Sequence, residues 1–302
     1  MSLLQKINKY GGIYLFNDAN NLKFSLFNYF YNKKIVNLKN VDEEISFFHE
    51  NGFFKPKINF KDEIDELKLN LDPSDVVRRN NFTFKYNLNA NTKNIIKKIL
   101  NTGDFLKLKK KIENYYNHKM YLINASVRRN FSLNLDNDHK IKYYSNNFHV
   151  DYYLINYFKI FINIHDVDED KGPLELFSKK NSKKFVKKGN YKDRNNYSIK
   201  AITDCNLIKN IGKTGDAFVC STPQCMHRAS SPKNGNYRDM LFLTFAVTST
   251  ANENSNDIFY FEKDFEKEIW TTSETLNDKL CKPKSFKKQL NLLKKFYKSK
   301  IS

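Results

Sequence analysis

The sequence has few of the residues that cross-link or interrupt a fold: four cysteines, nine glycines and six prolines among 302 residues. The cysteines stand at positions 205, 220, 225 and 281 and form no CxxC pair and no spacing typical of a zinc site. A disulfide framework is therefore not indicated. We expect reduced thiols, and a Cys220–Cys225 disulfide is the disfavoured alternative because such bridges are rare in reducing compartments.

Long apolar runs are also missing. Residues 1–10 lack the apolar centre of a secretory signal, and no later stretch approaches the roughly 18 to 20 apolar residues that a membrane helix needs. Hydrophobic residues still make up 40% of the chain, which is enough to bury a sizeable core. We expect a soluble, cytoplasmic protein with one domain over residues 1–302.

Acidic residues are outnumbered, 33 against 52 lysines and arginines, which gives a net charge of +19. Such a charge ordinarily indicates nucleic acid or another anionic partner. The abundance of Lys, Asn, Ile, Tyr and Phe, all residues of A/T-rich codons, offers genomic base composition as a second explanation. Only seven of the basic residues are arginine, so each retained arginine hints at a fork geometry that lysine cannot supply.

Residues 1–118 are predicted to be mostly helical with one short strand. The stretch "EEISFFHEN", residues 43–51, has the spacing of an amphipathic helix that Gly52 ends, and "FFKPKI" after it is typical of a strand. Further helices are expected over residues 61–70 and 92–117.

From about residue 119 to 250 the sequence predicts a β core. "MYLINASV", "YYLINYFKIFINIHDV", "GPLELF", "GDAFVCS" and "MLFLTFAVT" are rich in aromatic and branched residues and are separated by turn residues. Short strands at this spacing favour a sandwich or barrel, so the fold class is mainly β with helices (α+β). A lysine-rich insertion is expected near 178–200, and residues 251–302 form a helical extension with an amphipathic helix over 285–300.

His149 and Asp151, in "NNFHVDYYLIN", are the first candidate metal ligands. Side chains at i and i+2 of an extended segment point to the same side, so the two can converge on one ion. Two His and one carboxylate on one face of an octahedron suit a first-row metal and leave open positions. An HxD pair also arises by chance, and without a third ligand its interpretation as two polar residues at a strand end would be preferred.

The stretch "GDAFVCSTPQCMHRASSPKNGNYRDMLFLTF" supplies the missing partners. A jelly-roll folds its chain back so that His149 and His227 can face each other across the interior. The turn "SSPKNG" then returns the chain to an antiparallel neighbour, which places Arg238 deep in the same pocket. An arginine there is suited to bind a carboxylate through two parallel hydrogen bonds.

At these residues the chain resembles the phytanoyl-CoA dioxygenase-like family of Fe(II)- and 2-oxoglutarate-dependent oxygenases. The resemblance rests on "FHVD", on "DVDEDKGPLELF", on "GDAF" before the distal histidine, and on "HR" followed by "NYR". It extends back to "FFHENGFFKPKI" and covers roughly residues 43–248. The order and spacing of these motifs are more specific than any single one of them.

The resemblance implies a double-stranded β-helix, a cupin-like jelly-roll with helices packed on one sheet. It also implies that His149, Asp151 and His227 bind Fe(II), that Arg238 binds the C5 carboxylate of 2-oxoglutarate, and that O2 and a small molecule are the other substrates. The expected reaction is hydroxylation with release of succinate and CO2. Because related halogenases replace the carboxylate by a small residue, Asp151 indicates against halogenation.

Two departures from the family's pattern concern the surroundings of the triad. The "PGSH" turn usual after the "GPL" strand is replaced by "FSKKNSKK". The small hydroxyl residue often found two positions after the distal histidine is Ala229 here, so Ser230 or another group would have to assist Arg238.

The lysine pairs at 179/180, 183/184 and 187/188 would form one positive face on a helix. If that face borders the mouth of the site, it could attract a phosphorylated, nucleotide-linked or CoA-linked substrate; the alternative is a solvated, mobile loop. A second hypothesis for the whole protein is an oxygenase acting on a nucleic acid or protein, and a third is a non-catalytic jelly-roll binding protein. The sequence does not indicate an oligomeric state.

The remaining histidines and two further polar residues are assigned structural or solvent-exposed roles. Their patterns show no second ligand at a suitable spacing, or place the side chain on the other face of a strand or in a turn. These residues are His49, His118, His139, His165, Arg228 and Asp216.

Overall fold

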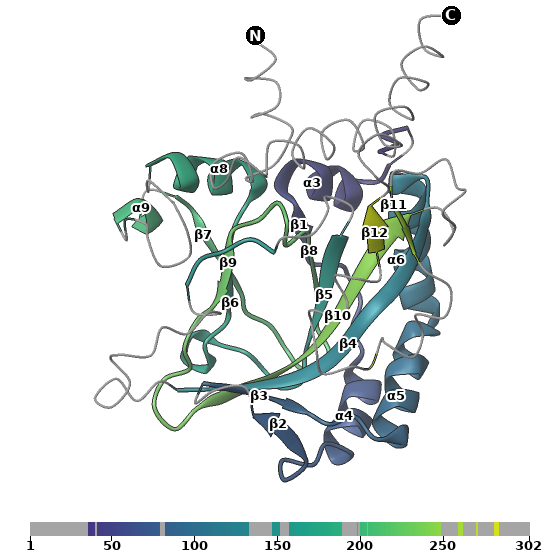
Figure 1. The fold of residues 1–302 in the computed structure, drawn as a ribbon, viewed down its shortest axis with the longest axis vertical. Coiled ribbons are helices and arrows are strands. Elements are labelled where there is room, and N and C mark those ends of the chain that lie inside the picture. Colours follow the sequence, from purple (N-terminus) through teal and green to yellow (C-terminus); the bar gives the residue numbers. More distant parts are fainter. Residues whose placement is uncertain are drawn as a thin grey trace, which may run out of the picture.

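The computed structural model describes residues 36–39, 41–78, 82–132, 147–151, 157–188, 198, 200–203, 205–248, 259–261, 270 and 281–283. Within these ranges two antiparallel sheets face each other, and helices cover the outer side of the larger sheet (Figure 1). None of the helices in this part of the chain is long and apolar enough to cross a membrane.

The helices lie mainly before residue 117 and after the strand β6. They are α3 (Glu43–Asn51), α4 (Lys61–Leu69), α5 (Ala90–Leu100), α6 (Gly103–Tyr116), the 3-10 helix η2 (Glu169–Lys171), α8 (Lys179–Lys188) and α9 (Lys200–Thr203). The strands are β1 (Phe53–Phe54), β2 (Val76–Arg78), β3 (Thr83–Tyr86), β4 (Lys119–Phe131), β5 (Tyr157–Asn163), β6 (Leu174–Phe177), β7 (Leu207–Asn210), β8 (Ala217–Cys220), β9 (His227–Ala229), β10 (Tyr237–Thr248), β11 (Phe259–Phe261) and β12 (Cys281–Pro283).

The larger sheet has the strand order β1-β8-β5-β10-β4-β3-β2, and the smaller one has the order β7-β6-β9. From β5 onward the chain passes to the smaller sheet at β6 and β7, returns at β8, crosses again at β9 and returns at β10. This alternation between two antiparallel sheets is the jelly-roll arrangement. The predicted fold class, mainly β with helices, is confirmed; α3 to α6 pack on the larger sheet, and α8 packs on the smaller one.

Alternation along the strands divides the buried residues between two sides of the larger sheet. Outward residues such as Ile123, Ile160 and Leu243 pack with the helices α3 to α6 in one core. Inward residues such as Phe161 and Met240 meet the smaller sheet in another core. Burial on both faces explains why these strands are nearly continuous apolar runs in the sequence.

Local signals set the ends of α3 where the sequence predicted them. Asp42 caps α3 by accepting a hydrogen bond from the Ile45 N–H at 2.9 Å. Gly52 ends the helix in the left-handed conformation, with φ of 82°, and its N–H donates to the Phe48 carbonyl at 2.7 Å. A residue with a side chain is rarely found in that conformation, so glycine sets the boundary.

The helix expected over 92–117 is two helices. Asn101 ends α5, and Thr102 begins α6 by accepting a hydrogen bond from the Phe105 N–H at 3.3 Å. The capping hydroxyl competes with a continuous helix at this point, and Gly103 adds a residue of low helix propensity. The apolar spacing alone did not reveal the break.

Two strands before residue 119 were not predicted. β2 and β3 form a hairpin whose second strand pairs with β4, with Phe84 opposite Arg129. The two strands are short, with the sequences VVR and TFKY, so neither shows a clear alternation, and the pairing with β4 supplies what the local pattern lacks. After residue 250, where a helical extension was expected, β11 pairs with β12; the helix predicted over 285–300 lies outside the described residues.

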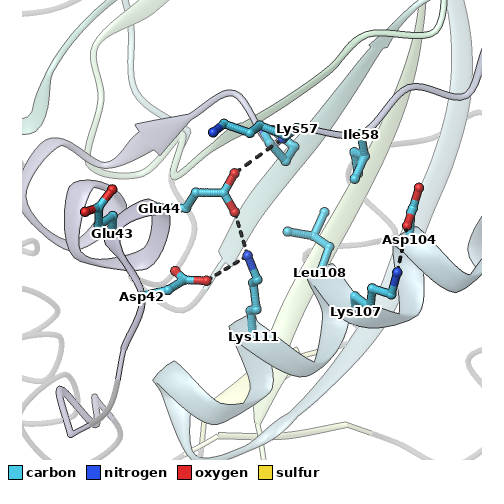
Figure 2. A pocket seen from close by; sticks show the side chains of 10 residues that line it. Asp42, Glu43, Glu44, Lys57, Ile58, Asp104, Lys107, Leu108 and Lys111 are labelled. Atoms are coloured by element: carbon cyan, nitrogen blue, oxygen red, sulfur yellow. Dashed lines mark hydrogen bonds and ion pairs between the residues drawn. The ribbon is translucent and has the colours of Figure 1, made fainter.

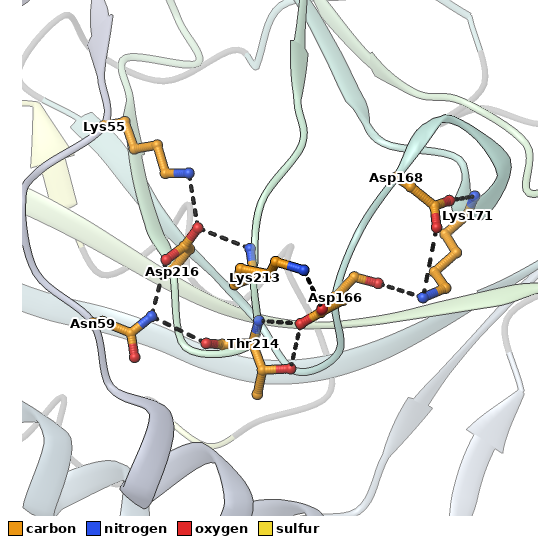
Figure 3. A network of polar contacts seen from close by, with 8 residues as sticks. All are labelled: Lys55, Asn59, Asp166, Asp168, Lys171, Lys213, Thr214 and Asp216. Atoms are coloured by element: carbon orange, nitrogen blue, oxygen red, sulfur yellow. Dashed lines mark hydrogen bonds and ion pairs between the residues drawn. The ribbon is translucent and has the colours of Figure 1, made fainter.

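A network of polar contacts joins three loops at one end of the larger sheet (Figure 3). Asp216 accepts hydrogen bonds from the Lys213 N–H at 2.8 Å and from Asn59 Nδ2 at 2.9 Å. Asp166 accepts from the Thr214 N–H at 2.9 Å. Asp216 is therefore a turn residue, as predicted. The cysteines at 205, 220 and 225 are buried thiols that form no disulfide.

Candidate metal centre

His149 and His227 are held opposite each other by their backbones. They form an isolated antiparallel bridge, in which the His149 N–H donates to the His227 carbonyl at 3.0 Å and the His227 N–H donates back at 2.9 Å. The Asp151 N–H donates to the Thr222 carbonyl at 3.2 Å. Main-chain hydrogen bonds thus fix all three candidate ligands relative to the strands β8 and β9.

The ligand atoms of these three residues all lie within 4.8 Å of one another. His149 Nε2 is 4.0 Å from Asp151 Oδ1, and His227 Nε2 is 3.9 Å from Asp151 Oδ2. Two ligands of one first-row ion, each about 2.0 to 2.2 Å from it, lie at most about 4.4 Å apart. Both imidazole-to-carboxylate separations meet this limit, each to a different oxygen of Asp151, so the three side chains surround one possible ion position. It is the one cluster of this kind within the described ranges.

The two imidazole rings are oriented in the same way. His149 Nδ1 lies 2.8 Å from the Asn147 carbonyl and His227 Nδ1 lies 2.9 Å from the Cys225 carbonyl, in each case two residues earlier in the chain. A carbonyl accepts a hydrogen bond only from a protonated Nδ1, which leaves the lone pair on Nε2. Each ring therefore presents Nε2 as a ligand, as outer hydrogen bonds do in metal sites.

The residues next to the ligands point to the other face of the smaller sheet. Arg228 Nε donates to Glu175 Oε2 at 2.7 Å, and the guanidinium lies 4.6 Å from the centroid of Phe148. The predicted salt bridge of Arg228 on the sheet is confirmed. Because alternate residues face opposite sides, this outward packing fixes the inward direction of His149 and His227.

The helix α8 covers this outer face. Its buried residues Phe185 and Val186 pack with Phe148 and Val150 in one apolar cluster. Lys180, Lys184 and Lys188 are exposed. The lysine-rich segment is therefore a helix packed behind the candidate ligands, and the predicted alternative of a solvated loop does not hold for residues 179–188.

Asp151 is ion-paired with a lysine that the sequence analysis did not select. Lys159 Nζ lies 2.8 Å from Asp151 Oδ2, and the two side chains are 12% and 15% exposed. Burial raises the pKa of Asp151, but Lys159, His227 and His149 together lower it well below its usual value. The signal available in the sequence was a single charged residue inside the apolar strand "YFKIFIN".

Arg238 lies at the start of β10 on the inward side, two residues before Met240 of the inner core. It is 2% exposed, and Nη1 donates to the Gly172 carbonyl. Its Nε has no hydrogen-bond partner among the described residues. Burial lowers the pKa of Arg238 to about 10, with Glu175 opposing the shift. A buried cation with an unsatisfied donor is suited to bind an anion.

Ser230, the residue expected to assist Arg238, donates its hydroxyl to the Pro173 carbonyl at 2.6 Å. That carbonyl directly follows the Gly172 carbonyl which accepts from Arg238. The structure thus brings Ser230 and Arg238 to the same turn, with their hydrogen bonds made to neighbouring backbone groups.

The other predicted structural histidines have partners away from the triad. His49 Nδ1 lies 2.8 Å from the Tyr115 hydroxyl, and burial together with Lys179 lowers the pKa of His49. His165 Nε2 lies 3.0 Å from Asp239 Oδ2. These contacts agree with the predicted structural roles. His139 lies outside the described residues.

The strand β4 has an unusual pattern for a strand inside a barrel. Its outward residues Ile123, Ala125 and Val127 are apolar and belong to the core under the helices. The residues between them, which alternate to the inward side, are all polar: Asn124, Ser126, Arg128 and Asn130. In register, Arg128 is opposite Met240, and Asn130 is opposite Arg238. A polar inner surface therefore runs beside Arg238.

A cleft of about 570 Å³ lies elsewhere, between α3, α6 and residues 56–58 (Figure 2). Five of its charged side chains form ion pairs with one another. Lys111 is 2.7 Å from both Asp42 and Glu44, and Lys107 is 3.3 Å from Asp104. The cleft contains no residue of the triad and is a salt-bridged surface groove.

No protein-family model matches the chain, and no curated protein matches it. Solved structures do match. HygX from Streptomyces hygroscopicus, with nickel and 2-oxoglutarate bound, has a TM-score of 0.48 at 15% identity, over 69% of this chain and 87% of its own. SnoN, a non-heme alpha ketoglutarate dependent epimerase from nogalamycin biosynthesis, has 0.48 at 10%, over 67% and 80%. EctD from S. alaskensis, with 2-oxoglutarate and 5-hydroxyectoine, has 0.47 at 11%, over 69% and 77%. The chain is similar to these proteins in fold.

Proposed function

We propose that this protein is an Fe(II)- and 2-oxoglutarate-dependent oxygenase that hydroxylates a polar small molecule. The observation that carries the proposal is the convergence of His149, Asp151 and His227 on one point inside the jelly-roll, with their ligand atoms within 4.8 Å of one another. The motif resemblance to the phytanoyl-CoA dioxygenase-like family leads to the same function from the sequence.

The donor set supports a first-row metal such as Fe(II). Two neutral imidazoles and one carboxylate form a facial triad, which leaves open positions on an octahedral ion. The Nδ1 hydrogen bonds to Asn147 and Cys225 hold both rings with Nε2 available. Bound iron, with 2-oxoglutarate and O2, would supply the oxidising chemistry, and succinate and CO2 would be released.

Arg238 is the proposed anchor of 2-oxoglutarate. Its guanidinium is buried on the inward side of β10, and no described residue forms a hydrogen bond with its Nε. The planar fork matches a carboxylate, and the C5 carboxylate is the group that a distant arginine would bind. Ser230 would assist only by releasing the Pro173 carbonyl, to which its hydroxyl now donates.

The inner surface of β4 supports a polar substrate. Asn124, Ser126, Arg128 and Asn130 offer amide, hydroxyl and guanidinium groups on the side that faces the triad and Arg238. Such groups can exchange hydrogen bonds with a polar substrate, which an apolar substrate cannot do. Arg128 further favours a molecule with an anionic group.

The test uses the full-length protein with Fe(II) under anaerobic conditions, and then with O2 and a panel of polar metabolites. We expect 2-oxoglutarate binding that depends on the metal, and succinate release that one class of metabolite stimulates. His149→Ala should abolish metal binding, and Arg238→Ala should raise the 2-oxoglutarate dissociation constant on the order of 100-fold, since a charge-assisted bidentate pair is lost.

His118→Ala is the matched control, because His118 lies outside the triad and is partly buried. Wild-type protein that binds neither Fe(II) nor 2-oxoglutarate would leave the non-catalytic jelly-roll as the correct hypothesis.

The exposed lysines of α8 keep a nucleic acid or protein substrate as a second candidate. Retention on a polyanion column that falls steeply with salt, together with turnover of a polymer only, would favour it.

A further inference from the structure

We propose that Lys159 is a positioning residue that makes Asp151 bind the metal through a single carboxylate oxygen. This role rests on the proposed metal centre and adds to it a residue outside the triad. Lys159 would thereby keep the remaining coordination positions of the ion open for the co-substrates.

The contacts of Lys159 are directed at the triad. It is on the inward side of β5, opposite Thr244 of β10 and Cys220 of β8 in register. The side chain is 12% exposed, and Nζ lies 2.8 Å from Asp151 Oδ2. Neither of these two partners in register is a carboxylate, and the ammonium forms its ion pair with Asp151.

The two oxygens of Asp151 are in different surroundings. Oδ2 is ion-paired with the Lys159 ammonium at 2.8 Å and lies 3.9 Å from His227 Nε2, whereas Oδ1 lies 4.0 Å from His149 Nε2 and outside that ion pair. The ion pair with the ammonium draws negative charge toward Lys159 and makes Oδ2 the weaker of the two ligands for a metal. Oδ1 is left as the ligand.

The number of Asp151 oxygens that bind the ion decides how many of its coordination positions stay open. Two imidazoles and one carboxylate oxygen leave three positions of an octahedral ion, whereas a carboxylate that binds through both oxygens leaves two. 2-Oxoglutarate bound through its keto oxygen and one carboxylate oxygen takes two positions, and O2 needs a third. A carboxylate that chelates the ion would therefore compete with the co-substrates.

Coordination can be counted with Mn(II) as the probe, by water-proton relaxation of the full-length protein loaded with Mn(II) alone. We expect about three exchangeable waters in wild type and in Lys159→Arg, which keeps the charge, and about two in Lys159→Met. The dissociation constant of 2-oxoglutarate for the Mn(II) protein should rise on the order of tenfold in Lys159→Met. The affinity for Mn(II) itself should not fall, because the carboxylate gains a second contact with the ion.

Lys179→Met is the matched control, because Lys179 is also partly buried and its Nζ donates to the His49 carbonyl at 3.1 Å, away from the triad. Lys159→Gln keeps a donor without the charge and replaces Lys159→Met if that variant does not fold. An unchanged water count and 2-oxoglutarate affinity, with Mn(II) bound, would overturn the role of Lys159 alone. Wild type that binds no Mn(II) would overturn the metal centre and this role together.

Discussion

His149 and His227 exchange two backbone hydrogen bonds, at 3.0 and 2.9 Å, although one precedes β5 and the other begins β9. The distance between the candidate ligands is thus set by main-chain pairing. The turn after β8 adds two further contacts, since the Thr222 carbonyl accepts from the Asp151 N–H and the Cys225 carbonyl binds the His227 ring. A site held in this way is formed before a metal arrives.

Metal removal should therefore leave the fold intact. We expect chelator-treated protein to keep its far-ultraviolet circular dichroism spectrum and to unfold cooperatively. Mn(II) or Fe(II) at about 100 times the dissociation constant should stabilise it by about 2.7 kcal/mol and raise Tm by several degrees. His227→Ala should show no such rise. Loss of the native spectrum on chelation would mean that the metal, and not the backbone pairing, organises the site.

Gly172→Ala should disturb both the fold and the binding of 2-oxoglutarate. Gly172 has φ of 66°, and an added Cβ would lie 2.4 Å from Pro232 N and 2.6 Å from the Ser230 carbonyl oxygen. The Gly172 carbonyl also accepts from Arg238, so a shift of this turn moves the arginine. We expect a destabilisation above about 2 kcal/mol and a weaker 2-oxoglutarate affinity, measured by urea unfolding and by titration.

Gly235 is the control for this glycine, because its φ is 79° and an added Cβ would lie more than 4 Å from every other described residue that is not its neighbour in the chain. Gly235→Ala should cost only the strain of the left-handed conformation, about 1 to 2 kcal/mol, and leave 2-oxoglutarate binding unchanged. Equal effects of the two substitutions would show that crowding at Gly172 is unimportant.

Phe185→Ala should destabilise the protein and weaken metal binding. Phe185 is fully buried, with its ring stacked on Phe177 at 4.9 Å and tilted against Phe148 at 5.4 Å. Deleting such a ring lowers the free energy of unfolding by about 3 to 5 kcal/mol. The cavity would lie next to Phe148, the residue that precedes His149. Urea unfolding and Mn(II) titration measure the two effects. Phe47→Ala, at a ring that is 47% exposed, should cost far less; comparable losses would contradict this packing role.

Arg129 and Asp239 should show strong energetic coupling. Arg129 Nε and Nη2 donate to the two oxygens of Asp239 at 2.7 and 2.6 Å, and Asp239 is 1% exposed. Arg129→Leu leaves a buried carboxylate without its main partner, which should cost about 3 to 5 kcal/mol. Removing both charges together should recover much of the lost stability. A double-mutant cycle of unfolding free energies measures the coupling, and additive losses would refute it.

Asp239 should also make stability depend on pH. Burial raises the pKa of Asp239, but Arg129 and His165 lower it by more than burial raises it. The pKa of Asp239 in the folded protein is therefore below the usual value. A carboxyl with a depressed pKa stabilises the fold above its unfolded pKa of about 3.9 and loses that contribution as pH falls. Asp239→Asn should be less stable at pH 7 and should lose less stability below about pH 4. Parallel curves of unfolding free energy against pH would argue against this origin.

Much of the site was predictable because its signals are local. His149 and Asp151 stand two apart before an apolar run, and His227 and Arg238 flank a turn. Lys159 was not selected, since a lysine inside "YFKIFIN" acquires its meaning only from Asp151 beside it. Ser230 was predicted from its position after His227, and its contact with Pro173 depends on how the turn at Gly172 packs.

In the fold, too, features set by local signals were predicted and features set by contacts between distant segments were not. Gly52 and Asp42 set the ends of α3 through their own conformation and hydrogen bonding, and the sequence predicted that helix. The hairpin of β2 and β3 was missed because its pairing with β4 is non-local. Tertiary contacts override weak local propensity wherever a strand completes the edge of a sheet.

By itself, the sequence determined which side chains share a face, because residue alternation in strands and the spacing in helices are local and nearly invariant. It thereby determined that His149 and Asp151 point the same way and that Arg228 points away from His227. Only the tertiary structure decided what each face meets. The pairing of His149 with His227, the ion pair of Lys159 with Asp151 and the polar inner surface of β4 join segments distant in the chain, and non-local packing selects them.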